Sequence, residues 1–270
     1  MSELPISLTR RGFCAGAAGI VLFPPELMAA DLNPAQIMQS SYQVTRFKNV
    51  RFTADLSLRY SKGTKQSRSL AGVAKIVDGG ALARLMRFTT PADMSGVATL
   101  TFERGSRRDD LWIYLPAMRR VRKLVTANRA DPWVGSDFSF GDILGHKVSD
   151  WNHALAGSER LSGGDCWCIT SVPLTPGLTR ETGYGRRRSW IRKSDYSLLR
   201  SDFFSASGQA LKSATFSDFR VLDGRNGKVQ PMVMTMQGTR TGSTSVLSFK
   251  QFDVGAAVKN DEILPEALNK

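Results

Sequence analysis

The chain has 270 residues, of which 41% are hydrophobic, 23% charged and 9% aromatic. This composition is typical of a globular protein and excludes a disordered or fibrous chain. Lys and Arg number 37 against 24 Asp and Glu, for a formal net charge of +13, and there are only two histidines. A His-rich metal site is therefore excluded, and the length predicts one large domain or two small ones.

Residues 1–30 have the pattern of an export signal. A twin-arginine motif, Thr9-Arg10-Arg11-Gly12-Phe13, precedes a short apolar core, and Ala29-Ala30 offers a small-residue cleavage site. The core is too short to span a bilayer as a helix. We predict a twin-arginine-type signal peptide over 1–30, with an ordinary secretory signal as the alternative.

Export changes what the basic charge indicates. Removal of 1–30 takes away two arginines and two glutamates, so the net charge stays at +13. In the periplasm of a Gram-negative cell, a basic surface favours anionic headgroups or an acidic partner. We therefore predict a periplasmic protein with no nucleic-acid partner.

Period-two alternation dominates the rest of the chain, after one helix predicted over 34–42 with Asn33 as its N-cap. From Phe52 to Tyr60, apolar residues alternate with polar ones, as in a half-buried strand. Further strands are predicted at 69–78, 82–90, 96–104, 110–115, 119–125, 148–160, 165–173, 186–193, 197–205, 211–222, 228–239 and 244–252.

Residues 126–147 interrupt this pattern and predict a long loop with a short helix near 139–144, capped by Asp137 and Asp142. The tail, 255–270, is polar and predicts irregular structure. Many evenly spaced strands predict a mainly β protein with a large antiparallel sheet, sandwich or barrel.

Enzyme signatures are missing from the sequence. It contains no nucleophile elbow, phosphate-binding loop, zinc-protease motif or dinucleotide fingerprint. His146, Asp150 and His153 share no obvious face, so we predict no metal, no cofactor and no catalytic residue. Cys166 and Cys168 flank Trp167, and we favour two small buried side chains over a disulfide.

Two segments are distinctive. The first runs from Asp109 to Lys123 and contains a predicted strand that is apolar on both faces, then Pro116, then a basic cluster. The second runs from Trp133 to Leu144. In the first, Leu111, Ile113 and Leu115 face one way and Trp112 and Tyr114 the other.

Together these segments resemble the LolA-like family of periplasmic outer-membrane lipoprotein-sorting proteins. The family's first motif matches at Asp110, Trp112, Tyr114, Leu115 and Pro116. Its second matches at Gly135, Ser136, Asp137, Phe138, Ser139 and Asp142. Phe140 stands where Tyr is usual, and Ile143 where Leu is usual. The signal has no lipobox, which favours a soluble carrier over a lipoprotein.

The resemblance implies a strongly curved antiparallel sheet that forms an unclosed barrel, with helices covering its concave face. It also implies that residues 31–270 form a single lipid-binding domain whose apolar cavity holds acyl chains. We expect the cavity to be lined by Trp112, Tyr114, Leu115, Phe138 and Phe140, with the 34–42 helix and the 133–145 loop as its gate.

Basic clusters predict a surface for anionic headgroups or for a partner. The expected residues are Arg119, Arg120, Arg122, Arg186, Arg187 and Arg188, and Arg104, Arg107 and Arg108 form a further cluster. We expect a monomeric carrier without enzyme activity, and the resemblance implies an RND-type membrane transporter as its partner. Two alternatives remain: an accessory subunit that docks on a transporter without carrying lipid, and an exported enzyme.

Overall fold

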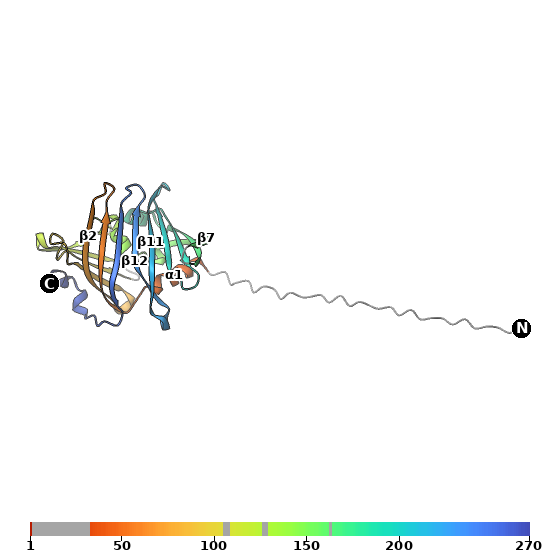
Figure 1. Ribbon diagram of the computed structural model, residues 1–270, viewed down its shortest axis with the longest axis horizontal. Helices are drawn as coiled ribbons and strands as arrows, with labels where there is room; N and C mark the ends of the chain where they lie inside the picture. The colour runs from red at the N-terminus through yellow and green to blue at the C-terminus, as the bar shows by residue number, and fades with distance from the viewer. Residues whose placement is uncertain (2–32, 105–108, 126–128, 162–163) are drawn as a thin grey trace. The chain divides into compact units, whose positions relative to one another are not determined.

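The computed structural model describes Met1 and residues 33–104, 109–125, 129–161 and 164–270 (Figure 1). The predicted signal peptide over 1–30 and two arginines of one basic cluster, Arg107 and Arg108, lie outside the described residues. Residues Asn33–Lys270 form one compact unit.

Thirteen strands form a single sheet in which every neighbouring pair is antiparallel. They are β1 Asn49–Arg59, β2 Lys65–Ile76, β3 Leu82–Phe88, β4 Ala98–Glu103, β5 Asp110–Leu115, β6 Arg120–Leu124, β7 Trp151–Leu161, β8 Gly164–Pro173, β9 Arg186–Arg192, β10 Leu198–Phe204, β11 Ala210–Asp223, β12 Lys228–Gly238 and β13 Thr244–Asp253.

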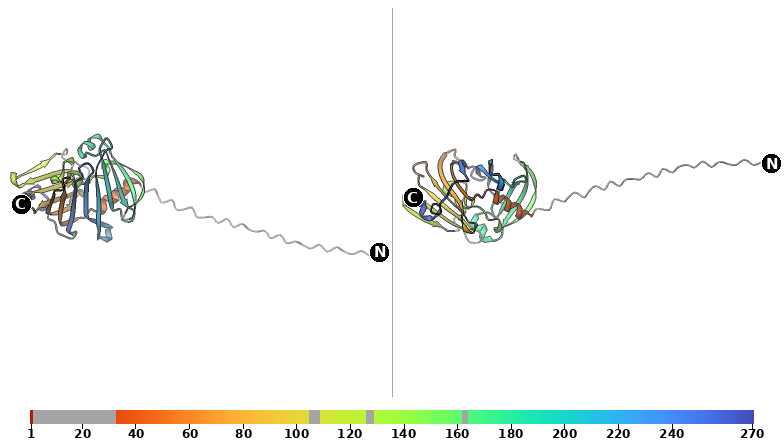
Figure 2. Two further views of the ribbon diagram at one scale, coloured as in Figure 1. Left: turned by 45° about the horizontal axis from the view of Figure 1, so that its top comes forward. Right: turned by 90° about the horizontal axis from the view of Figure 1, so that it is seen from below.

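The order of the strands explains why the sheet stays open. It runs from β6 to β1, crosses to β13 and continues down to β7, so β6 and β7 are the two unpaired edges. Each predicted strand overlaps one of the observed strands. The sheet curls around its concave face (Figure 2), which confirms the expected unclosed barrel.

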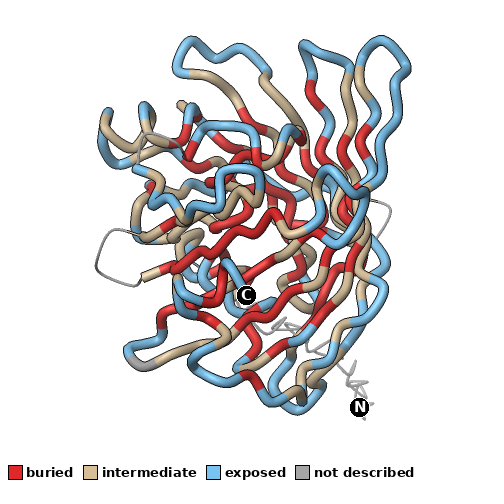
Figure 3. The backbone as a smooth tube through the Cα atoms, turned by 90° about the vertical axis from the view of Figure 1, so that its left-hand side faces the viewer, coloured by how far each residue is buried: buried red, intermediate tan, exposed pale blue. Residues whose placement is uncertain are grey.

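Alternation along the strands separates the two faces of the sheet. In β1, Val50, Phe52, Ala54, Leu56 and Leu58 are all buried, and they belong to the core on the concave face. Buried segments run through the middle of the strands, and the hairpin turns are exposed (Figure 3). Burying one face of a half-apolar strand fixes its register, because a one-residue slip would expose the apolar side chains.

Helix α1, Pro34–Val44, lies within the curve of the sheet (Figure 2) and packs against β7, β9 and β12. Its predicted start is confirmed, since the Asn33 side chain accepts a hydrogen bond from the backbone N–H of Ala35 and Pro34 follows. Ile37 and Met38 are its buried apolar side chains.

The segment between β6 and β7 joins the two edges and packs into the main core through Trp133 and Phe138. Its short helix α2, Phe140–Leu144, begins with a capping box between Ser139 and Asp142. Asp137 does not cap this helix. Its carboxylate instead accepts hydrogen bonds from Ser243 and Ser245 of the β12–β13 hairpin region.

The C-terminal tail has more structure than its polar sequence predicts. Two 3-10 turns, Asn260–Ile263 and Pro265–Asn269, lie against the convex face of β2–β6. Ile263 and Leu268 are buried there with Leu85 and Leu100 in a second core. Four buried apolar residues of the tail, Val258, Ile263, Ala267 and Leu268, are enough to cover this face, because the strands supply the rest of the apolar surface.

A third helix, α3 over Pro176–Thr182, was not expected from the strand pattern. Its signals are local: Thr175 caps the first turn, Pro176 starts the helix, and Gly183 ends it with φ +77°. No helix in the described residues is both long and apolar enough to cross a membrane.

Candidate functional site

A cavity of about 310 Å³ lies between α1, the α2 segment and the concave face of the sheet. This volume is at the lower end of the range usual for small-molecule sites. Among its lining residues are Met38, Ser41, Tyr42, Arg46, Phe52, Arg84, Met86, Glu103, Phe138, Asp142, His146, Arg187, Ser197, Ser201, Phe203, Ala214, Phe216, Gln230, Met234, Met236, Leu247 and Phe249.

Most of the cavity wall is apolar and comes from alternate positions of β1 and β11–β13. Met234, Met236 and Leu247 lie beside one another across β12 and β13, and the Phe52 ring meets the Phe249 ring edge to face, with centroids 5.4 Å apart. Gly72 on β2 leaves room for the Phe52 ring, since a Cβ there would collide with it. Methionines make such a wall adaptable, because their side chains are unbranched and flexible.

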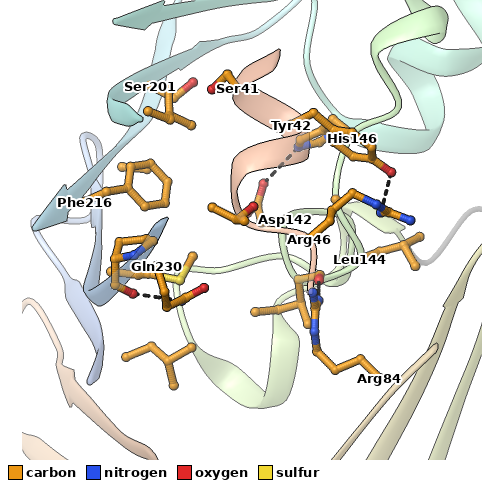
Figure 4. A pocket seen from close by; sticks show the side chains of 18 of the residues that line it. Ser41, Tyr42, Arg46, Arg84, Asp142, Leu144, His146, Ser201, Phe216 and Gln230 are labelled. Carbon is orange, nitrogen blue, oxygen red and sulfur yellow. Dashed lines mark hydrogen bonds and ion pairs between the residues drawn. The ribbon is translucent and has the colours of Figure 1, made fainter. Parts of the chain in front are cut away.

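A buried polar network ties α1 to the sheet at one side of the cavity. Arg46 donates to the Tyr42 hydroxyl at 2.6 Å (Figure 4). Arg46 also donates to Glu103 at 2.8 Å, and Tyr42 donates to Glu103 as well. Burial and the nearby Asp109 carboxylate raise the pKa of Glu103 to about 8, and Lys147 and Arg129 act in the opposite direction. The contact with the Arg46 guanidinium also favours the charged form of Glu103.

A second polar network centres on Asp142 at the N-terminal end of α2. Its carboxylate accepts hydrogen bonds from Lys212 at 2.6 Å and from the Tyr184 hydroxyl at 2.9 Å. Burial by itself would raise the pKa of Asp142, but Lys212 and His146 outweigh it and hold that pKa well below its usual range. Burial and the charge of Arg187 lower the pKa of His146 to about 4, so its ring is neutral near pH 7.

Two further arginines of the cavity have no carboxylate within 4.0 Å among the described residues. Arg84 donates to the Ile143 carbonyl at 2.5 Å. Arg187 lies over the Trp151 ring, 4.3 Å from its centroid. Burial lowers the pKa of each guanidinium to about 10, so both remain charged near neutral pH.

The structure places the expected cavity residues in three different positions. Phe138 lines the cavity, whereas Phe140 and Leu115 pack in the surrounding core without lining it. Trp112 and Tyr114 are on the opposite, convex face with the C-terminal tail. The alternation read from β5 was therefore right, and the residues on its other face, Leu111 and Ile113, are those that point toward the main core.

The expected basic residues also divide. Arg119, Arg120 and Arg122 are exposed at the turn into edge strand β6 and along it, and Arg186 is exposed on β9. Arg188 is half-buried and pairs with Glu159 on the convex face. Arg187 is only 6% exposed and lines the cavity, so it is not part of a surface patch.

Sequence reasoning missed the charged residues inside the cavity, although alternation carries a signal for some of them. In β3, Arg84 occupies the same face as Leu82, Met86 and Phe88. A single charge on an apolar face is unusual, because burying it costs free energy unless it is paired. The partner of such a charge depends on the tertiary fold, and no spacing in the sequence links Arg46 to Glu103.

The described residues form no recognisable metal site and no disulfide. No group of three His, Cys, Asp or Glu side chains in the described part of the chain is arranged to hold a metal. Both ring nitrogens of His153 are within hydrogen-bond distance of partners, Ser171 and the Val148 carbonyl. Cys166 and Cys168 are free and buried, as favoured over a disulfide.

Comparisons with known proteins agree with this geometry. A family model described as an uncharacterized protein matches residues 81–270, and no curated protein matches. An outer membrane lipoprotein-sorting protein domain from Vibrio parahaemolyticus has a similar fold, with 21% identity, a TM-score of 0.81, and 88% of this chain and 98% of that chain covered.

Two other solved structures are also similar. A DUF1329 family protein from Desulfovibrio piger ATCC 29098 has 26% identity, a TM-score of 0.80, and 87% of this chain and 99% of that chain covered. A LolA superfamily protein from Nitrosomonas europaea has 16% identity, a TM-score of 0.67, and the same coverage of 87% and 99%.

Proposed function

Because this chain belongs to a LolA-like protein family, we propose that it carries the acyl chains of a lipid or lipoprotein in its cavity. The observation that carries the proposal is the apolar cavity between α1 and the concave face of the sheet. An acyl chain needs only an apolar wall, and each buried methylene contributes about 0.8 kcal/mol to binding.

The structure of the wall suits a protein that must also release its cargo. Phe52, Met234 and Met236 supply apolar surface, while Arg46, Glu103 and Asp142 interrupt it with charged groups that already bond to one another or to their neighbours. An interrupted wall limits the affinity that burial alone can provide. We propose that the protein is a carrier and not an enzyme, since these polar groups are engaged in holding α1 and α2.

We further propose that the carrier works in the periplasm and transfers its cargo toward the outer membrane, as a monomer and with an RND-type transporter as its source or partner. The twin-arginine pattern in residues 1–30 supports export. The exposed Arg119, Arg120 and Arg122 at edge strand β6 supply a basic surface that fits an acidic protein loop or anionic headgroups.

Mass spectrometry of organic extracts tests the proposal. The mature protein, purified from periplasm without detergent, is expected to contain a near-stoichiometric lipid. A matched sample that has been delipidated and refolded should regain saturable binding of a fluorescent fatty acid. A folded protein that neither contains lipid nor binds the probe would contradict the carrier function.

The accessory-subunit alternative rests on the same basic edge. In that case the Arg119-Arg120-Arg122 surface would bind a membrane partner, and the cavity would serve only as core. Replacing these three arginines with Gln should then abolish partner capture, while fluorescent fatty acid binding would be absent from the unaltered protein as well. The carrier function predicts that the same variant keeps its acyl-chain binding.

A further inference from the structure

Unfilled hydrogen-bonding capacity is concentrated in the cavity. Five buried side-chain atoms lack a hydrogen-bond partner in the described structure, and three of them belong to lining residues: Arg187 Nε, Ser197 Oγ, and His146 Nε2, which faces the Asp142 carboxylate at 3.5 Å. Buried polar atoms in native proteins are nearly always paired, so such a group of exceptions calls for an explanation. Ser197 lies near the far end of β9, whereas Arg187 and His146 lie together.

The Trp151 ring is what brings these two groups together. Arg187 lies over it at 4.3 Å, and the His146 ring meets it edge to face, with centroids 5.8 Å apart. Stacking occupies the face of a guanidinium and leaves its N–H groups, which lie in the plane at its edge, free to donate. The Arg187 side chain is only 6% exposed, its Nε has no hydrogen-bond partner, and it forms no ion pair with any described residue.

Neighbouring charges do not neutralise Arg187. Asp142 is the carboxylate that acts on it electrostatically, but Asp142 is held by Lys212 at 2.6 Å and by Tyr184. Arg188, the next residue along β9, points to the convex face and has Glu159 as its partner at 2.5 Å. An unpaired buried cation is costly, and an anion in the cavity would remove that cost.

We propose that Arg187 binds the anionic head of an acyl-chain amphiphile, a carboxylate or a phosphate, inside the cavity. This inference rests on the proposed carrier function and narrows its cargo. The guanidinium edge matches the paired oxygens of either headgroup. The acyl chain then lies along the apolar wall of β11–β13, and a lipid with an uncharged head leaves Arg187 without its anion.

Competition binding with three probes of equal chain length tests the proposal. Laurate, dodecyl phosphate and dodecanol each displace a fluorescent fatty acid from the mature protein. We expect one or both anions to bind about tenfold to a hundredfold more tightly than dodecanol, because a hydrogen bond to a charged group contributes that much. Which anion is preferred identifies the headgroup. Equal binding of all three probes would overturn the proposal while leaving the carrier function intact.

Two variants on adjacent residues locate the effect. Arg187→Met should lower anion binding to the level of dodecanol binding, whereas Arg188→Met, on the opposite face of the same strand, should keep the preference. Arg187→Lys keeps the charge without the planar fork and should retain a smaller preference. An unchanged preference in folded Arg187→Met would refute the role of this residue, and no binding of any probe to the unaltered protein would refute the carrier function together with it.

Discussion

A larger side chain on one wall of the cavity should reduce the length of the acyl chain that binds most tightly. Ala214 is 2% exposed on the concave face of β11 and lines the cavity. Its cross-strand partners, Ser201 and Met236, line the cavity too. Ala214→Leu adds three carbon atoms at this point. If they displace about three methylenes of a bound chain, the ligand loses roughly 2.4 kcal/mol, or about 60-fold in affinity.

The assay is a chain-length series of fatty acids, from ten to eighteen carbons, titrated against unaltered protein and Ala214→Leu. The best chain for the variant should be about three carbons shorter. Stability should change little, since the added atoms fill existing space instead of displacing packed side chains. Ala210→Leu, at an exposed position of the same strand, serves as the control. A folded Ala214→Leu with the same affinities and the same optimum as the unaltered protein would show that chains do not occupy this cavity.

Three further predictions concern stability, each measured by urea denaturation. Glu103→Leu leaves Arg46 buried and unpaired and should lower the free energy of unfolding by about 3 kcal/mol. The double variant Glu103→Leu with Arg46→Met should recover most of that loss. Equal losses in the single and the double variant would contradict the pairing of Arg46 with Glu103. The pKa of His146 is lowered to about 4. In the unfolded chain His146 takes up a proton as the pH falls through about 6.5, whereas in the folded protein it stays neutral down to about pH 4. The free energy of unfolding therefore decreases as the pH falls from 6.5 to 4. In His146→Leu the free energy of unfolding should fall by roughly 3 kcal/mol less over this pH range than in the unaltered protein. Parallel plots of stability against pH for the two proteins would exclude this role of His146. Leu268→Ala should cost about 2–4 kcal/mol, with faster amide exchange in the tail; an unchanged tail would mean that Leu268 does not anchor it.

Alternating apolar and polar residues, together with turn and capping residues, were sufficient to locate the strands and two of the three helices. The helix start at Asn33, the thirteen strands and the short helix near Ser139 all follow from local patterns. Alternate residues of a strand share one face of the sheet irrespective of the rest of the fold. The helix over Pro176–Thr182 was missed because its capping signals are short and lie among strands.

Assigning faces to a cavity needs more than periodicity. In β5 the sequence separates Trp112 and Tyr114 from Leu111 and Ile113, but both sets are apolar. Only the tertiary structure shows that the C-terminal tail covers the first set and that the concave core takes the second. Aromatic side chains suit either environment equally well, so their chemistry carries no information about which face is hollow.

The sequence by itself determined the fold class, the strand periods and a family resemblance carried by two short segments, because these depend on local propensity and on alternation. The tertiary structure alone decided which arginine is buried. Arg186, Arg187 and Arg188 are adjacent and chemically identical, yet one lines the cavity, one pairs with Glu159 and one is exposed. The curvature of the sheet and the partners brought from distant strands set these three environments, and the proposed headgroup site follows from that difference.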